Sequence, residues 1–183
     1  MARIPYLDSS DLAPEHRDLL ARNINLYRAM VHSPDGARAF GALGQFIRFK
    51  SRLDARLREM AILQVGYVTR SVYEYTHHIK IGRDFGVSDD DIRAIAAETE
   101  GKPTPLEPLA KAVLRAAREM TQGLAISDET FALLREQLDH ERLTDLVLII
   151  AFYNGVVRFL ATMRIDNEPE YQRLLAEFPL PPQ

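Results

Sequence analysis

Apolar residues recur at intervals of three and four along most of the chain, and this spacing is typical of amphipathic helices. Alternating apolar and polar residues, the sign of a half-buried strand, are absent, so the pattern predicts an all-α fold. Capping residues and prolines place helix starts at Pro14, Pro34, Asp54, Ser71, Ser88, Thr104 and Ser127, before a long apolar helix from Leu143 to Met163. The first of these helices is expected to run unbroken to Val31.

Two of the predicted helices are apolar on nearly every side, which is typical of buried helices. One follows Asp54 and the other lies within Leu143 to Met163. A glycine and three prolines between Gly101 and Pro108 mark a linker that separates helical halves of about 1–100 and 104–178. We expect a single domain over 1–183, and an internal duplication and two ordinary core helices explain the similar halves equally well.

Composition narrows the function classes. The 183 residues are 46% hydrophobic and 27% charged with a net charge of −3, as in ordinary globular proteins, which favours a small-molecule partner over nucleic acid. No uncharged run approaches the roughly 18 residues of a membrane span, so we expect no membrane association and a cytoplasmic location. The chain has no cysteine, which excludes disulfide and thiol chemistry by its own side chains.

The densest cluster of titratable residues on apolar helices consists of Glu59, Glu74 and His78. Glu74 and His78 are four residues apart and therefore share a helix face. With a turn near Arg70, Glu59 lies roughly 15 Å before that turn and His78 roughly 12 Å after it. The two side chains are therefore expected to lie side by side.

The spacing of this cluster resembles that of the alkylhydroperoxidase D-like superfamily, which includes the carboxymuconolactone decarboxylases. Its peroxidase branch has a glutamate, eleven residues, then Cys-x-x-Cys-x-x-x-His, in which the glutamate and histidine relay protons to the cysteines. In this chain Glu59 and His78 match the relay, while Ser71 and Glu74 take the cysteine positions. The segment is more similar to the cysteine-free branch, which often has Tyr-Glu-Trp-x-x-His, with Tyr75 in place of the tryptophan.

The resemblance implies an alkylhydroperoxidase D-like helical bundle that forms a homo-oligomer, either a dimer, a trimer or a hexamer. It also implies a cofactor-independent lyase or isomerase, such as a decarboxylase, acting on a small carboxylate or lactone. His78 is then the acid, Glu59 sets its tautomer and raises its pKa, and Glu74 places the substrate or relays the proton. Di-iron helical bundles need two Glu-x-x-His segments, and only Glu74-x-x-His77 is present, so no metal is expected.

Other residues have two interpretations each. Ser71 binds substrate or, with Glu74, forms a capping box at a helix start. Tyr75 belongs to the motif that binds substrate, and His77, turned about 100° from His78, is expected at a surface or an interface. A later segment, Phe152-Tyr153-Asn154-x-x-x-Arg158-Phe159, resembles a second motif of the superfamily; Asn154 and Arg158 hold a substrate carboxylate or form a structural pair.

Two rival functions stay open at this stage. Peroxidase or peroxiredoxin-type activity is suggested by the superfamily name, but without cysteine it needs an external thiol or a bound metal. The other rival is a non-catalytic oligomeric binding protein in which the glutamates and His78 persist as a buried polar network. The basic run from Arg48 to Arg58 is expected to be a solvated stretch, with an anion-attracting rim as the alternative.

Overall fold

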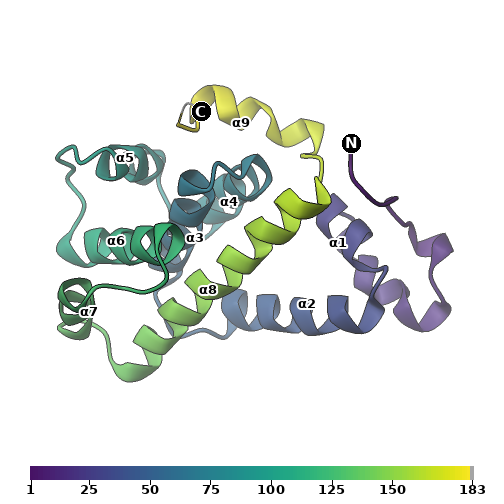
Figure 1. The fold of residues 1–183 in the computed structure, drawn as a ribbon, viewed down its shortest axis with the longest axis horizontal. Helices are drawn as coiled ribbons and strands as arrows, with labels where there is room; N and C mark the ends of the chain where they lie inside the picture. The colour runs from purple at the N-terminus through teal and green to yellow at the C-terminus, as the bar shows by residue number, and fades with distance from the viewer. Residues whose placement is uncertain (182–183) are drawn as a thin grey trace.

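The computed structural model describes residues 1–181, and this part of the chain is helical without strands (Figure 1). The all-α prediction is therefore confirmed. The α-helices are α1 (Asn25–Met30), α2 (Pro34–Phe49), α3 (Ala55–Val68), α4 (Val72–Asp84), α5 (Asp89–Thr99), α6 (Pro108–Gln122), α7 (Asp128–Arg135), α8 (His140–Met163) and α9 (Arg173–Glu177). Short 3-10 helices span Ser9–Asp11, Pro14–Leu20 and Pro169–Tyr171.

Helix α3 forms the centre of the core and packs against α4, α5, α6 and α8 (Figure 1). Eleven of its fourteen residues are buried, including Met60, Ile62 and Leu63, as its continuous apolar sequence predicted. Because α3 comes from the first half of the sequence and α6 and α8 from the second, both halves contribute to one apolar core. Helix α9 lies over α4, on the side away from α2.

The predicted turn near Arg70 is present and reverses the chain between α3 and α4. Arg70 adopts the left-handed conformation with φ of 53°, and the amide of Ser71 donates to the carbonyl of Gly66 at 2.9 Å. Gly66 lies directly against α4, so the two helices run side by side and place Glu59 near His78. The turn thus positions the residues of the predicted site.

Two predictions about the helices are wrong: the continuity of the first one and the start at Thr104. The segment from Pro14 to Val31 is broken: a 3-10 helix ends at Leu20, Ile24 is extended, and α1 begins at Asn25. A contact distant in sequence stabilises the new helix start, since the Asn25 amide donates to Glu168 at 2.8 Å. Helix α6 begins at Pro108 rather than Thr104, because proline fits the first helical position and the Thr104 carbonyl instead accepts a bond from Lys111.

Helix α8 is long and apolar enough, by length and composition, to cross a membrane. Core helices of globular proteins pass the same test, so this is weak evidence for a span. Its buried side chains, among them Leu146, Ile149 and Ile150, belong to the core cluster, and the helix packs against α3 and α6. Its apolar sequence is explained by this packing.

The helix starts at Asp54 and Ser71 allow a matched test of capping. The Asp54 carboxylate accepts from the Leu57 amide at 3.0 Å, whereas the Ser71 hydroxyl makes no capping bond to α4. We expect Asp54→Ala to lower the free energy of unfolding by about 1 kcal/mol and Ser71→Ala to change it by less than about 0.5 kcal/mol. Urea unfolding measures both, and equal losses would contradict this assignment of the caps.

Candidate active site

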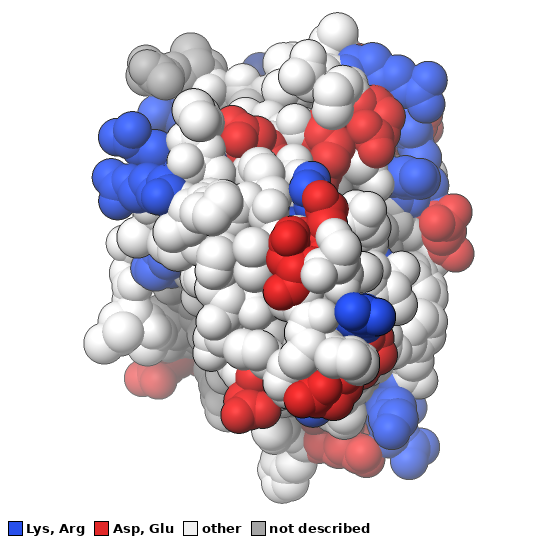
Figure 2. Space-filling view, turned by 90° about the vertical axis from the view of Figure 1, so that its right-hand side faces the viewer, with Lys and Arg blue, Asp and Glu red and all other residues white. Residues whose placement is uncertain are grey.

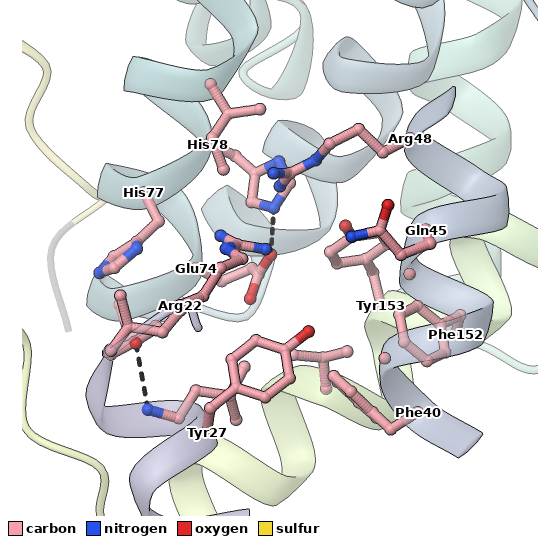
Figure 3. A pocket seen from close by; sticks show the side chains of 17 residues that line it. Arg22, Tyr27, Phe40, Gln45, Arg48, Glu74, His77, His78, Phe152 and Tyr153 are labelled. Carbon is pink, nitrogen blue, oxygen red and sulfur yellow. Dashed lines mark hydrogen bonds and ion pairs between the residues drawn. The ribbon is translucent and has the colours of Figure 1, made fainter. Parts of the chain in front are cut away.

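A cavity of about 60 Å³ lies between α2, α4, α8 and the segment that leads into α1 (Figure 3). Helix α4 contributes four polar or aromatic side chains to the lining of the cavity: Tyr73, Glu74, His77 and His78. The other labelled residues around the cavity are Arg22, Tyr27, Phe40, Gln45, Arg48, Phe152 and Tyr153. The cavity therefore brings together residues from four separate parts of the sequence.

His78 lies between two carboxylates. Its Nδ1 is 2.7 Å from Oε2 of Glu59. Its Nε2 is 2.9 Å from Oε1 of Glu74, the contact that Figure 3 shows. The exposed fractions of Glu59, Glu74 and His78 are 1%, 3% and 5%, so solvent screens these ion pairs little. The expectation that Glu59 and His78 lie side by side is correct. In residues 1–181, no three His, Asp or Glu side chains have an arrangement that could hold a metal ion.

The two carboxylates keep His78 charged at neutral pH. Burial alone would lower the pKa of His78, but the negative charges of Glu74 and Glu59 and their polar contacts raise it to about 9. Burial would likewise raise the pKa of Glu59, yet its attraction to His78 and Arg58 outweighs burial and lowers it. Arg58 donates to Glu59 at 3.0 Å and is itself buried, so Glu59 has two cationic neighbours.

Glu74 differs from Glu59 in its hydrogen bonds. Although its Oε1 lies 2.9 Å from Nε2 of His78, it accepts no properly aligned hydrogen bond and is buried without a donor from residues 1–181. The short distance between Glu74 and His78, together with the poor hydrogen-bond alignment, is typical of an ion pair between residues one turn apart on the same helix. We therefore treat Oε1 as an acceptor that is free for a ligand inside the cavity.

Tyr153 is a site residue that the sequence did not single out. Its ring meets the edge of His78, with 5.0 Å between ring centroids and an interplanar angle of 82°. Burial, and then the charges of Glu74 and Glu59, raise the pKa of its hydroxyl well above the ordinary value, so this group stays protonated. A neutral hydroxyl that donates a hydrogen bond thus lies beside the charged imidazole.

Comparisons with known proteins agree with this geometry. The profile of the carboxymuconolactone decarboxylase family matches residues 34–119, which include Glu59, Glu74 and His78. The alkylhydroperoxidase AhpD core of an uncharacterized peroxidase-related protein from Ralstonia eutropha JMP134 superposes with a TM-score of 0.81 over 98% of both chains, at 20% identity. Residues 34–119 are therefore similar to the carboxymuconolactone decarboxylase family, and the chain has the fold of the alkylhydroperoxidase AhpD core.

Two further solved structures share the superfamily fold. The debrominase Bmp8 in complex with 2,3,4-tribromopyrrole has a TM-score of 0.81 and 20% identity, covering 97% of this chain and 100% of Bmp8. A putative antioxidant defence protein AhpD from Agrobacterium tumefaciens has a TM-score of 0.66 and 21% identity, covering 75% of this chain and 93% of its own. At these identities the likeness shows the fold alone. None of the curated proteins matches the sequence.

The structure does not bring Ser71, Tyr75, Asn154 or Arg158 to the cavity. Ser71 and Arg158 line a separate groove beside the turn between α3 and α4, and Tyr75 packs against Tyr67 on the far side of α4. Asn154 donates to Thr121 at 3.0 Å and accepts from Arg158 at 2.9 Å, which is the structural pair that the sequence left open. The predicted capping box is wrong, because Ser71 makes no capping bond and Glu74 faces His78 instead.

The expectation of a surface position for His77 is also wrong, since only 4% of it is exposed. Its ring stacks between Tyr73 and Tyr171, with centroid distances of 4.1 and 3.8 Å, and Nε2 lies 2.7 Å from Glu168. Tyr171 and Glu168 follow α8, so the chain after α8 covers His77. Helical spacing correctly predicted that the His77 side chain points away from His78. Only the tertiary structure shows that other parts of the chain cover His77 on that side.

Several cavity residues have weak or no sequence signals. Arg48 belongs to the basic run that was interpreted as solvated, and Tyr153 directly precedes Asn154 in the second motif. Arg22 and Tyr27 come from the segment that was predicted as a continuous helix. Because the helix start after Ile24 is stabilised by Glu168, over 140 residues away, their approach to His78 could not be read from local sequence.

Proposed function

We propose that this protein is an acid–base catalyst, a cofactor-independent lyase or isomerase, that acts on a small carboxylate or lactone in the cavity beside His78. The observation that carries the proposal is a buried imidazolium between two carboxylates, one of which has an oxygen that is ion-paired with His78 but accepts no aligned hydrogen bond. Such a site places a proton donor and a proton acceptor beside the same small volume. The match of residues 34–119 to a family named for a decarboxylase supports this assignment.

The residues have separate roles in this proposal. His78 donates a proton from Nε2, because Nδ1 is held by Glu59. Glu74 takes up or positions a proton of the substrate. In a decarboxylation the carbon–carbon bond breaks, carbon dioxide leaves, and the electron pair stays on the substrate as an enolate-like anion. His78 protonates the carbon of that anion, and a proton from water restores the imidazolium.

The cavity size restricts the substrate. A cavity of about 60 Å³ is smaller than the roughly 150 Å³ that suffices for benzene in an apolar protein interior. The reacting end of the substrate therefore enters between α2 and α4, and the remainder lies at the mouth beside Arg22, which is exposed. A small substrate with few atoms beyond its reacting group fits this description.

We further propose a homo-oligomer in the cytoplasm, whether dimer, trimer or hexamer, built from a single domain. An apolar groove of about 610 Å³ between the start of α2 and α8, lined by Phe40, Phe152 and Phe159 among others, is a surface that such an association would cover. In Figure 2, acidic and basic side chains are scattered over one face with uncharged surface between them. That face lacks the continuous basic patch of nucleic-acid-binding proteins.

Peroxidase-type activity is the second candidate, favoured by the description of a structural neighbour as peroxidase-related. Against it stands the absence of cysteine from all 183 residues, so reduction of a peroxide would need an external thiol. Turnover of an organic hydroperoxide by the metal-free protein with an added small thiol as reductant, faster than with the thiol alone, would favour this candidate over acid–base catalysis.

The pH dependence of turnover tests the proposal. With unsaturated lactone carboxylates as substrates and product formation followed by NMR, we expect a rate that is constant up to about pH 8. Above about pH 9 the rate should fall tenfold for each pH unit, because the acid His78, whose pKa is raised to about 9, loses its proton. His140→Ala, at an exposed histidine, is the control and should keep the same profile. A rate that is unchanged to pH 10 would contradict the role of His78.

A further inference from the structure

We infer that the substrate of this cavity is a small anion that also carries a hydroxyl or N–H group. Arg22, Arg48 and Tyr153 hold its anionic end, while Glu74 accepts a hydrogen bond from its donor group. The inference rests on the proposed function for the location of the reaction, but it concerns binding. It is argued from polar groups around the cavity that lack partners in the protein.

The first observation is a pair of arginines without carboxylate partners. Arg38, Arg52 and Arg56 each lie within 4 Å of a carboxylate, at Asp18, Glu141 and Glu107 respectively. Arg22 and Arg48, by contrast, pair with no carboxylate of residues 1–181, and both line the cavity (Figure 3). Three cationic side chains, Arg22, Arg48 and His78, thus lie at the cavity, against the carboxylate of Glu74 in its lining and that of Glu59 behind His78. This excess of positive charge favours an anion.

The second observation is the Tyr153 hydroxyl. This group belongs to a buried residue that lines the cavity, and it hydrogen-bonds to no group of residues 1–181. Both Arg48 and Arg22 are near enough to influence it electrostatically. A protonated hydroxyl beside two cations is a set of donors, and a carboxylate or an oxyanion is the ligand group that satisfies all three.

The third observation is the acceptor on the opposite side. Oε1 of Glu74 is buried and receives no aligned hydrogen bond from residues 1–181. A buried carboxylate oxygen without a donor is unfavourable, so a ligand that supplies an O–H or N–H group gains from meeting it. An anion without such a group would instead be repelled by the Glu74 charge.

These requirements exclude the simpler ligand classes. A neutral apolar molecule would leave the arginines, Tyr153 and Glu74 all unsatisfied. A cation would be attracted by Glu74 but repelled by Arg22, Arg48 and the imidazolium of His78. Only a ligand with an acceptor at one end and a donor at the other matches both sides of the cavity.

Three probe molecules of nearly the same shape test separately whether the ligand needs a negative charge and whether it needs an N–H group. Pyrrole-3-carboxylate has both the charge and the N–H group, furan-3-carboxylate lacks the N–H group, and pyrrole-3-carboxamide lacks the charge. We expect calorimetry or ligand-observed NMR at pH 7 and low salt to show pyrrole-3-carboxylate binding at least tenfold more tightly than either of the others. Equal binding of all three probes, or no binding of any, would overturn the inference.

Variants of the full chain test which residues bind the anionic end of the ligand and which bind its donor end. Arg48→Gln should weaken binding of pyrrole-3-carboxylate about tenfold and leave the carboxamide unchanged, because it removes the charge and keeps an amide donor. Glu74→Gln should reduce the preference for pyrrole over furan, because a neutral amide oxygen accepts a weaker hydrogen bond from the N–H group than a carboxylate does. Arg52→Gln, at an exposed arginine outside the cavity, is the matched control for Arg48→Gln. An effect of Arg52→Gln equal to that of Arg48→Gln would show non-specific attraction and contradict the inference.

These measurements do not depend on turnover, so they can be separated from the proposed function. The expected binding pattern without turnover of any small carboxylate or lactone would overturn acid–base catalysis and keep the substrate class. Turnover of a neutral molecule with the expected pH profile would keep the catalytic role of His78 and overturn the substrate class. Circular dichroism of Glu74→Gln shows whether the variant is folded, and Arg48→Gln changes a partly exposed side chain and tests the anion end independently.

Discussion

His78→Ala is expected to lower the free energy of unfolding at pH 6 by about 3–5 kcal/mol, the usual cost of removing one partner from a buried ion pair. The imidazolium is the cation that lies between Glu59 and Glu74, and all three side chains are at least 95% buried. Without it, Glu74 has no cation within ion-pair distance among residues 1–181, and Glu59 retains only Arg58. Urea unfolding of the variant and the parent protein at several pH values measures the loss.

The loss should depend on pH in a definite way. Because the pKa of His78 is raised from 6.5 to about 9, its stabilisation is complete below about pH 6.5 and disappears as the pH rises through 9. Because the pKa of Glu59 is lowered from 4.5, its contribution is complete above about pH 4.5 and disappears as the pH falls through its folded value. The destabilisation should therefore be greatest between about pH 4.5 and 6.5.

Two controls separate charge from packing in this experiment. His140→Ala, at an exposed position, should change the free energy of unfolding by less than about 0.5 kcal/mol. In the background of Glu59→Gln, the cost of His78→Ala should be smaller, because one of the two carboxylates is then absent. The same cost in both backgrounds would mean that the ion pair contributes nothing beyond the volume of the ring.

Gly66→Ala is expected to cost about 2 kcal/mol of folding free energy and to disturb the site. A Cβ at Gly66 would lie 3.1 Å from the amide nitrogen and 3.2 Å from the Cα of Tyr75, both of which are backbone atoms of α4. Backbone atoms cannot rotate away, so α3 and α4 must separate, which overpacks the contact and outweighs the better helix propensity of alanine. Thermal and urea unfolding measure the cost.

Gly155→Ala is the matched control for this substitution. Gly155 also lies within a helix, α8, and a Cβ there would meet no atom within 4 Å. This variant should be as stable as the parent protein or more stable by up to about 1 kcal/mol, because alanine favours the helix. If both variants had the same stability, close contact between α3 and α4 at Gly66 would not be what positions Glu59 beside His78.

Residues close in sequence gave the most accurate predictions. The start at Asp54, the turn near Arg70 and the burial of α3 follow from local patterns, and the structure confirms them. The contact between Glu59 and His78 was also predictable, because one short turn joins the two helices and fixes their register. Local patterns failed where distant contacts compete with them, as at Ile24, where Glu168 stabilises the start of α1.

By itself, the sequence determined the helical fold, the absence of thiol chemistry and the trio of Glu59, Glu74 and His78. These depend on residue type and on spacing within one helical hairpin. Only the tertiary structure decided which other groups surround that trio: Arg22, Arg48 and Tyr153 reach the cavity, whereas Ser71, Tyr75, Asn154 and Arg158 do not. The reason is physical. Helical spacing fixes the direction of a side chain relative to its own helix, and the packing of helices far apart in the sequence fixes what that side chain meets.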